Sequence, residues 1–232
     1  MSIYAMSDLH LAISIDKPMD VFGRRWSNYM ERIEENWNRT VGKDDYVLIP
    51  GDISWATYLD EAYLDFKFID SLNGKKVISK GNHDYWWTTI SKLRKYLEEK
   101  EFGSITFLNN NSVKVDDVVV CATRGWKCPN EDEFTKEDKK IYDREVQRLK
   151  LSLESVEDKE CEKCVMIHFP PFNGKREMNE LIELMIEHDV KNCFYGHLHG
   201  GAFCKSFEGM MEGINFRLIS ADYLDFTPIL IM

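Results

Sequence analysis

Residues 76–84 of the chain are Lys-Val-Ile-Ser-Lys-Gly-Asn-His-Asp. A short apolar run reaches a glycine and is followed at once by Asn82, His83 and Asp84, whose side chains can bind a metal or move a proton. This order is typical of a buried strand that ends in a tight loop. It predicts a strand over Lys76 to Ser79 with functional side chains beyond its carboxyl end.

The same arrangement occurs at four other places, where an apolar run stops before a potential ligand. The runs and the side chains that follow them are Ile3 to Met6 before Asp8 and His10, Tyr46 to Ile49 before Asp52, Val165 to Ile167 before His168, and Cys193 to Tyr195 before His197 and His199. In α/β sheets, the loops beyond the carboxyl ends of the strands converge on the ligand crevice. These five loops are therefore expected to form one site.

Short apolar runs alternate with longer amphipathic segments along the whole chain, which predicts the α/β class. Further strands are expected at Ile105 to Leu108, Val118 to Ala122, Asn192 to Tyr195, Phe203 to Ser206, Phe216 to Ser220 and Pro228 to Ile231. Helical periodicity is found in Trp26 to Thr40, Glu61 to Leu72, Thr89 to Lys100, Lys136 to Val156 and Glu177 to His188. A hairpin is expected around Asp116 and Asp117, which adds antiparallel pairing, so the sheet system should be mixed.

Size and composition predict a single domain over residues 1–232, because 44% of the 232 residues are hydrophobic and can form a substantial core. A formal charge of -10 opposes the capture of nucleic acid polymers and anionic membranes. Neither a signal peptide nor a membrane span is recognisable, so a cytoplasmic protein is expected.

The six cysteines lack the spacing of a disulfide framework and should be reduced thiols. Cys161 and Cys164 form one CxxC pair, but the chain has no second pair for a zinc ribbon.

The donor types predict a metal centre. Nitrogen and oxygen donors without a thiolate suit manganese, iron, zinc or cobalt, and the sequence leaves this choice open. Seven candidates exceed the need of one ion, and a carboxylate such as Asp52 can bridge two. Two adjacent metals activate a bridging water and stabilise both oxygens of a phosphoryl displacement. The chain is therefore predicted to be a dinuclear metal-dependent phosphohydrolase.

These motifs resemble those of the calcineurin-like metallophosphoesterase superfamily and its bacterial predicted phosphohydrolases: Asp8-Leu9-His10, Gly51-Asp52, Gly81-Asn82-His83-Asp84, His168 and Gly196-His197-Leu198-His199. The resemblance implies a four-layer α/β/β/α sandwich with the metals at the strand carboxyl ends. It implies that Asp8, His10 and His199 hold one metal, that Asn82, His168 and His197 hold the other, and that Asp52 bridges. By the same resemblance, His83 stabilises or protonates the leaving oxygen. We hypothesise that Asp84 orients His83.

Differences from the protein phosphatases of this superfamily indicate which substrate to expect. Protein phosphatases of this superfamily have Asp-Arg-Gly after Gly-Asp, whereas this chain has Ile53-Ser54-Trp55, so a small-molecule phosphomonoester or phosphodiester is expected. One alternative is a non-catalytic scaffold of this fold, which is expected to lose ligands that this chain retains. Another is a nuclease, which the acidic charge disfavours. The sequence does not predict the oligomeric state.

Four tryptophans lie near the predicted loops, namely Trp55, Trp86, Trp87 and Trp126. Ordinary core packing explains such residues. The alternative hypothesis is one pocket in which Arg124 anchors a phosphate, Trp86, Trp87 or Trp126 stacks on a flat leaving group, and the segment from Asn130 to Val156 forms a helical cap. The acidic residues Asp60, Glu61, Asp65 and Asp70, and those of Glu131 to Glu145, are expected to be solvated.

Overall fold

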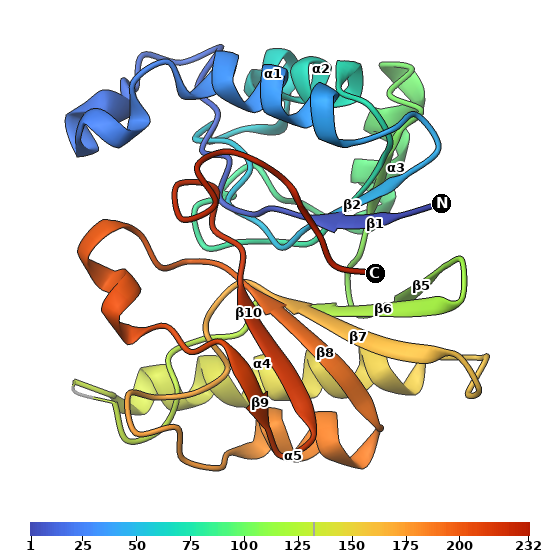
Figure 1. Cartoon of the computed structure of the whole chain (residues 1–232), viewed down its shortest axis with the longest axis vertical. Helices are drawn as coiled ribbons and strands as arrows, with labels where there is room; N and C mark the ends of the chain where they lie inside the picture. The colour runs from blue at the N-terminus through green and yellow to red at the C-terminus, as the bar shows by residue number, and fades with distance from the viewer. Residues whose placement is uncertain (132) are drawn as a thin grey trace.

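Two β-sheets lie in the middle of the molecule and helices cover their outer sides (Figure 1). This computed structural model describes residues 1–131 and 133–232. Both sheets contain parallel and antiparallel pairs. The order of layers is helix, sheet, sheet, helix, so the predicted α/β sandwich with two mixed sheets is confirmed.

The first sheet has the strand order β11-β1-β2-β3-β4. Its strands are β1 (Ile3–Ala5), β2 (Tyr46–Ile49), β3 (Lys75–Ile78), β4 (Ile105–Phe107) and β11 (Ile229–Leu230). All neighbouring pairs are parallel except β1 with β11. Helices α1 (Tyr29–Thr40), α2 (Tyr63–Ser71) and α3 (Ile90–Glu99) cover its outer side (Figure 1). Burial on both faces explains why β2 is a continuous apolar run.

The second sheet has the strand order β5-β6-β7-β8-β10-β9. Its strands are β5 (Ser112–Val115), β6 (Val118–Thr123), β7 (Glu162–Ile167), β8 (Val190–Tyr195), β9 (Gly209–Met211) and β10 (Ile214–Leu218). The predicted hairpin around Asp116 and Asp117 joins β5 to β6. Apolar residues from both sheets, including Leu48, Val120 and Met166, form one buried cluster. This shared core joins the sheets and so fixes the relation between their carboxyl ends.

The segment from Asn130 to Val156 differs from the prediction of a cap. Residue 132 lies outside the described part of the chain. Helix α4 (Lys136–Glu154) buries Tyr142, Leu149 and Leu153 and packs against β6. Together with α5 (Glu180–Glu187), it forms the outer layer of the second sheet (Figure 1). Its apolar face is therefore occupied by the sheet, and its residues Glu145 and Arg148 line a cavity at the end of β6.

Two other local predictions were wrong. Residues Phe203 to Ser206 do not form a strand, because Gly200–Lys205 is a short 3-10 helix with no buried residue. Asp65 and Glu145 are not solvated, since both side chains are buried and accept hydrogen bonds from neighbouring segments. None of the described helices has both the length and the apolar character needed to cross a membrane.

Candidate metal centre

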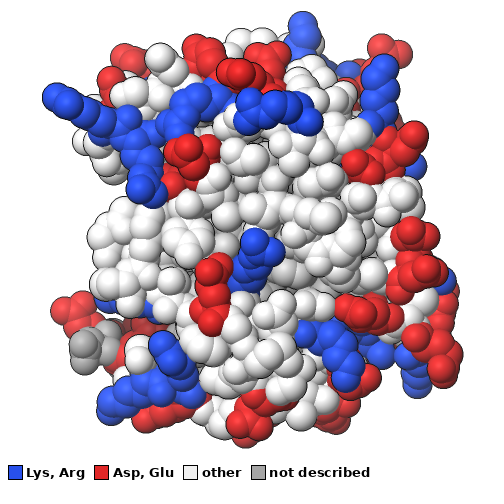
Figure 2. Space-filling view, in the orientation of Figure 1, with Lys and Arg blue, Asp and Glu red and all other residues white. Residues whose placement is uncertain are grey.

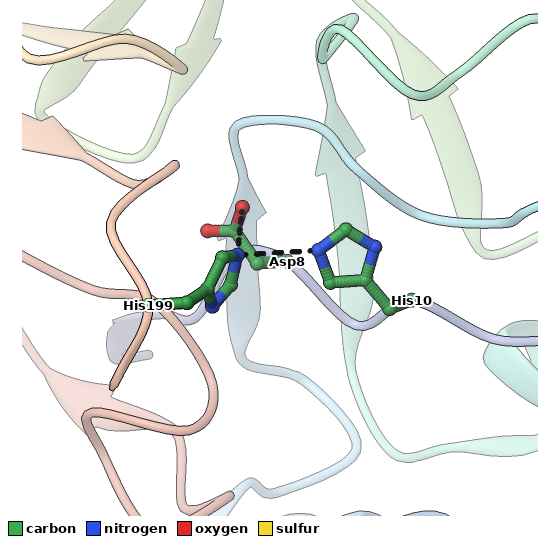
Figure 3. A group of neighbouring side chains, drawn as sticks. All are labelled: Asp8, His10 and His199. Atoms are coloured by element: carbon green, nitrogen blue, oxygen red, sulfur yellow. Dashed lines mark hydrogen bonds and ion pairs between the residues drawn. The ribbon is translucent and has the colours of Figure 1, made fainter. Parts of the chain in front are cut away.

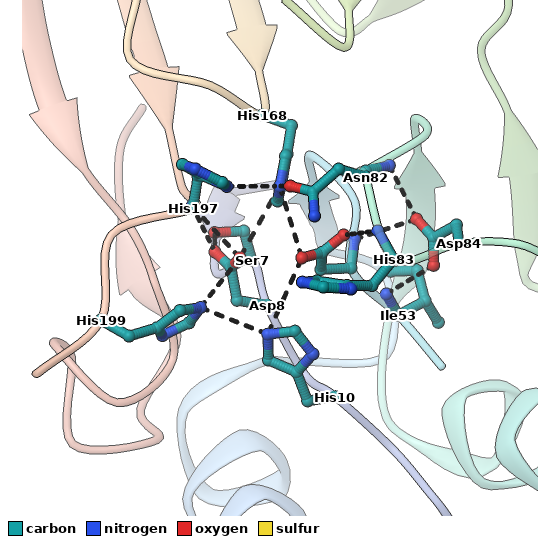
Figure 4. Close-up of polar contacts among 12 residues, drawn as sticks. Ser7, Asp8, His10, Ile53, Asn82, His83, Asp84, His168, His197 and His199 are labelled. Carbon is teal, nitrogen blue, oxygen red and sulfur yellow. Dashed lines mark hydrogen bonds and ion pairs between the residues drawn. The ribbon is translucent and has the colours of Figure 1, made fainter. Parts of the chain in front are cut away.

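Five loops meet at the carboxyl ends of β1, β2, β3, β7 and β8, where the two sheets lie against each other. All seven predicted metal ligands are in these loops. Figure 4 labels every one of them except Asp52 and shows the labelled side chains gathered around one centre, and Oδ2 of Asp52 is 3.4 Å from Nε2 of His168. The backbones of the two sheets also connect here, because Ser7 forms a bridge with Ser220. The convergence expected from the strand ends is therefore present in the structure.

Asp8, His10 and His199 form the first group of candidate ligands (Figure 3). Their donor atoms all lie within 4.8 Å of one another. Nε2 of His199 is 3.4 Å from Oδ1 of Asp8 and 3.2 Å from Nε2 of His10. Two ring nitrogens at this distance need a shared proton or a shared cation between them, because their lone pairs repel. The group therefore fits a metal ion.

Asp8, Asp52 and His168 form the second group, with all donor atoms again within 4.8 Å. Nε2 of His168 is 2.7 Å from Oδ1 of Asn82, 3.4 Å from Oδ2 of Asp52 and 3.3 Å from Nδ1 of His197. The same Asp52 oxygen is 3.8 Å from Nε2 of His10 in the first group. Asp52 thus lies between the two groups, where one carboxylate can reach two ions.

Hydrogen bonds at Nδ1 orient the rings of two candidate ligands, His168 and His199. Nδ1 of His168 is 3.0 Å from the carbonyl oxygen of Pro50, and Nδ1 of His199 is 2.8 Å from Oδ1 of Asp222. Donation from Nδ1 leaves Nε2 free to bind a metal, an arrangement common behind metal-binding histidines. Asp222 is not among the residues predicted from the sequence. The pattern that predicts the other ligands, a strand that ends just before a potential ligand, is also present here, because Asp222 follows the predicted strand Phe216 to Ser220 after a single alanine.

Burial controls the protonation of these side chains in the polypeptide alone. It lowers the pKa of His168 to about 3 and that of His197 to about 4, so both rings are neutral and can donate a lone pair. Burial also opposes a charge on His199, but hydrogen bonds with Asp222 and Asp8 outweigh it and raise the pKa of His199 to about 10. Burial acts to raise the pKa of Asp8, yet the hydrogen bond from His199 and the nearby histidine charges lower it. The centre therefore stabilises a carboxylate next to positive charge.

The backbone at the centre is unusual. Four candidate ligands have positive φ angles, namely Asp8 (59°), His10 (47°), Asp52 (52°) and His197 (71°). Residues other than glycine rarely adopt this region, and such strain concentrates at functional sites. Gly51 also has a positive φ of 88°, and a Cβ there would lie 2.2 Å from the amide nitrogen of Gly81. The loops that carry Asp52 and Asn82 therefore pack backbone against backbone.

His83 and Asp84 point in different directions. The ring of His83 lies beside those of Trp55 and His10, with centroids 4.4 Å and 5.7 Å away. Its Nδ1 has no hydrogen-bond partner among the described residues. The buried Asp84 carboxylate instead accepts hydrogen bonds from the backbone amides of Asp52, Ile53 and Gly81. Asp84 therefore ties the metal-site loops together, and the hypothesis that it orients His83 was wrong.

A comparison with known protein families agrees with this geometry. The family model of the calcineurin-like phosphoesterases matches residues 1–201. The chain belongs to the calcineurin-like phosphoesterase family. It is thus a hydrolase of phosphoesters, from a family that depends on two metal ions, and the Asp and His groups described above could hold them.

Solved structures share the fold of this calcineurin-like phosphoesterase. A phosphopantetheinyl hydrolase from Mycobacterium tuberculosis has a TM-score of 0.58 at 11% identity, with 100% of this chain and 95% of the other covered. A protein of unknown function, AQ665 from Aquifex aeolicus, has a TM-score of 0.51 at 16% identity, with 99% and 95% covered. TT1561 of Thermus thermophilus has a TM-score of 0.54 at 12% identity, with 85% and 81% covered. No curated protein matches the chain.

The predicted substrate residues do not share one pocket. Trp86 is buried in the core, where its indole nitrogen donates to Asp84, so it cannot stack on a substrate. Trp126 lines a cavity of 430 Å³ beside His197. Arg124 and Trp87 line a different cavity of 400 Å³. A third cavity of 440 Å³ lies at the first ligand group and is lined by His10, His83, His199 and neighbouring aromatic side chains.

Proposed function

We propose that this phosphoesterase hydrolyses small-molecule phosphate esters at a dinuclear metal centre. The observation that carries the proposal is the cavity of 440 Å³ at the first ligand group, which His83 lines together with His10 and His199. Its volume lies within the range of pockets that hold small organic ligands. The apolar side chains of Met19, Trp26 and Trp55 form much of its wall and can contact the organic part of an ester.

The chemistry of the side chains supports a division of roles. Asp8, His10 and His199 would hold one metal, and Asn82, His168 and His197 the other, with Asp52 between them. When bound, the ions would polarise the phosphoryl group and lower the pKa of the attacking water. Asp222 holds the ring of His199, and the Pro50 carbonyl holds that of His168.

His83 is placed to act on the leaving oxygen. It lines the cavity at the first ligand group, and Trp55 packs against its ring. Its backbone amide donates to Oδ1 of Asp52 at 2.8 Å, which ties its position to the metal centre. A histidine so placed can donate a hydrogen bond or a proton to the departing oxygen.

A nuclease acting on long polymers is less consistent with the surface. Figure 2 shows lysine and arginine interspersed with aspartate and glutamate on the face drawn, with a largely uncharged band between the upper and lower layers. The formal charge of -10 adds a general repulsion of phosphate backbones. Short phosphate esters do not require a broad basic surface.

The test is a panel of esters assayed with manganese. It contains p-nitrophenyl phosphate, bis(p-nitrophenyl) phosphate, a 2′,3′-cyclic nucleotide, a phosphopantetheinyl ester and a single-stranded oligonucleotide. The phosphopantetheinyl ester is included because one protein of the same fold is a phosphopantetheinyl hydrolase. We expect at least one small ester to be hydrolysed faster than the oligonucleotide. Faster hydrolysis of p-nitrophenyl phosphate would indicate a monoesterase, and faster hydrolysis of bis(p-nitrophenyl) phosphate would indicate a diesterase.

The matched control is His168→Ala, purified in the same way, which should abolish the activity and so exclude a contaminating phosphatase. The proposal fails if the oligonucleotide is the best substrate, or if the fully metal-loaded protein hydrolyses none of the esters.

A further inference from the structure

A cavity of 400 Å³ lies apart from the candidate metal ligands, and none of the seven lines it. It opens where β3, β4 and β6 end, beside helix α4 and the beginning of helix α3. Lys80, Arg124 and Arg148 line it together with a single carboxylate, that of Glu145. Three cationic side chains face one anionic one, in a protein whose formal charge is -10.

Glu145 does not neutralise this group of cations. Its buried Oε1 accepts hydrogen bonds from Nη2 of Arg124 at 3.0 Å and from Nη1 of Arg148 at 2.6 Å. Its Oε2 accepts the hydroxyl of Thr123 at 2.8 Å. One negative charge is therefore shared by two guanidinium groups, and Lys80 takes no part in the contact. The cavity wall keeps a net charge of about +2 when each group has its ordinary charge.

Several donors at the cavity have no acceptor. Nε of Arg124 is buried and has no hydrogen-bond partner among the described residues. Lys80 forms neither a hydrogen bond nor an ion pair with any residue that the structure describes. Helix α3 begins at Ile90 beside the cavity residue Thr89, and the first turn of a helix carries partial positive charge. Buried donors normally have partners, so a bound anion would supply the acceptor that Nε of Arg124 lacks.

We propose that this cavity is a second anion site that binds a phosphate group of a ligand. Lys80 would contact the phosphate as a point charge, and the guanidinium groups of Arg124 and Arg148 would supply directed donors. Trp87 and Leu108 form an apolar part of the wall that can contact the remainder of the ligand. The phosphate belongs either to the far end of a substrate or to a separate effector.

The position of the cavity favours a link to the catalytic centre. Lys80 is two residues before Asn82, and the carbonyl oxygen of Arg124 accepts the backbone amide of His168 at 3.1 Å. An anion bound by Lys80 and Arg124 therefore lies next to the loops that carry two candidate ligands. This inference goes beyond the proposed function, because binding of an anion here does not require hydrolysis.

Selenate is a suitable probe, since it is a tetrahedral oxyanion with an anomalous X-ray signal. Crystals of the metal-loaded protein soaked in selenate should show a selenium peak in the cavity between Lys80, Arg124 and Arg148, apart from any peak at the metals. In solution, Lys80→Met should weaken selenate binding by roughly tenfold or more, because it removes a charge-assisted hydrogen bond. Arg148→Gln should weaken it in the same direction.

Lys114→Met is the matched control, because Lys114 is an exposed lysine that pairs with Asp158 and does not line the cavity. Its selenate affinity should equal that of the wild type. Metal content is measured for every variant, so that a disturbed metal centre is recognised. A selenium peak only at the metals, or unchanged affinity in Lys80→Met, would overturn the proposal.

Kinetics distinguish the two sources of the phosphate. If it is part of the substrate, Lys80→Met should raise KM for a nucleoside bisphosphate more than for the matching monophosphate. If it belongs to an effector, selenate should change the rate of p-nitrophenyl phosphate hydrolysis in the wild type, and Lys80→Met should remove this response. Absence of both effects would overturn a role of the site in the enzyme.

Discussion

Asp222 orients the ring of His199, because its Oδ1 lies 2.8 Å from Nδ1 of that ring. The other ring nitrogen, Nε2, faces Asp8 and His10. A second Asp222 oxygen accepts the backbone amide of Gly200 at 3.2 Å, so the carboxylate fixes both the ring and the loop that carries it. Asp222 is a positioning residue for one ligand of the first group.

Asp222→Asn should therefore weaken metal binding without removing a ligand. The amide keeps the shape of the side chain but loses the charge that makes the imidazole a stronger donor, and such changes typically cost about 10- to 100-fold in metal affinity. The measurement is competition with a fluorescent chelator. Asp189→Asn is the control, because Asp189 is an exposed aspartate that pairs with Lys191. Equal affinity of the two variants would show that Asp222 does not act on the metal.

Asp52→Asn should reduce the occupancy of both metal positions. Oδ2 of Asp52 is 3.4 Å from Nε2 of His168 and 3.8 Å from Nε2 of His10, so one carboxylate serves both ligand groups. Its negative charge holds two cations close together. Elemental analysis should find two ions per wild-type chain and fewer than one in the variant. Loss of a single ion would mean that Asp52 does not bridge.

His83→Ala should keep its metals and lose turnover by roughly 10²- to 10⁴-fold, the usual effect of a lost general acid. The deficit should be smaller for p-nitrophenyl phosphate than for an alkyl phosphate, because nitrophenolate leaves without protonation. Metal analysis and initial rates on both esters test this. Equal losses on the two esters would contradict the acid role, and loss of metal would make His83 a ligand.

The stability of the protein should rise with pH because of Lys76. This lysine is fully buried, and burial lowers its pKa from 10.5 to about 8. Below about pH 8 Lys76 is charged in both the folded and the unfolded chain, so folding carries the full free-energy cost of burying the charge. Between about pH 8 and pH 10.5 the unfolded chain binds more protons than the folded chain. The free energy of unfolding therefore increases with pH over this range, by up to about 3 kcal/mol.

Urea unfolding of the wild type and of Lys76→Met from about pH 7 to about pH 10.5 tests this. The substitution removes the titrating group, so the difference in stability between the two proteins should change over this range. Parallel curves would contradict a lowered pKa of Lys76 in the folded protein.

The candidate ligands were predictable because each follows an apolar run directly. Asn82 and His168 are far apart in the chain, but both follow parallel strands, and their side chains meet at 2.7 Å. Asp222 follows a strand in the same way and was missed, because it belongs to no motif of the resembling family. Its role depends on the contact with His199, which the sequence does not display.

The sequence by itself determined the strand ends and the donor atoms, because hydrophobic periodicity and ligand chemistry are properties of the local chain. Only the tertiary structure decided what neighbouring side chains do. The turn after Gly81 sends Asp84 to the backbone amides while His83 reaches the cavity, and Trp86 enters the core while Trp87 lines a cavity. Arg124 binds Glu145 because α4 packs on β6, which places residues 21 positions apart in contact. Such contacts depend on how separate elements pack, and local sequence does not specify that packing.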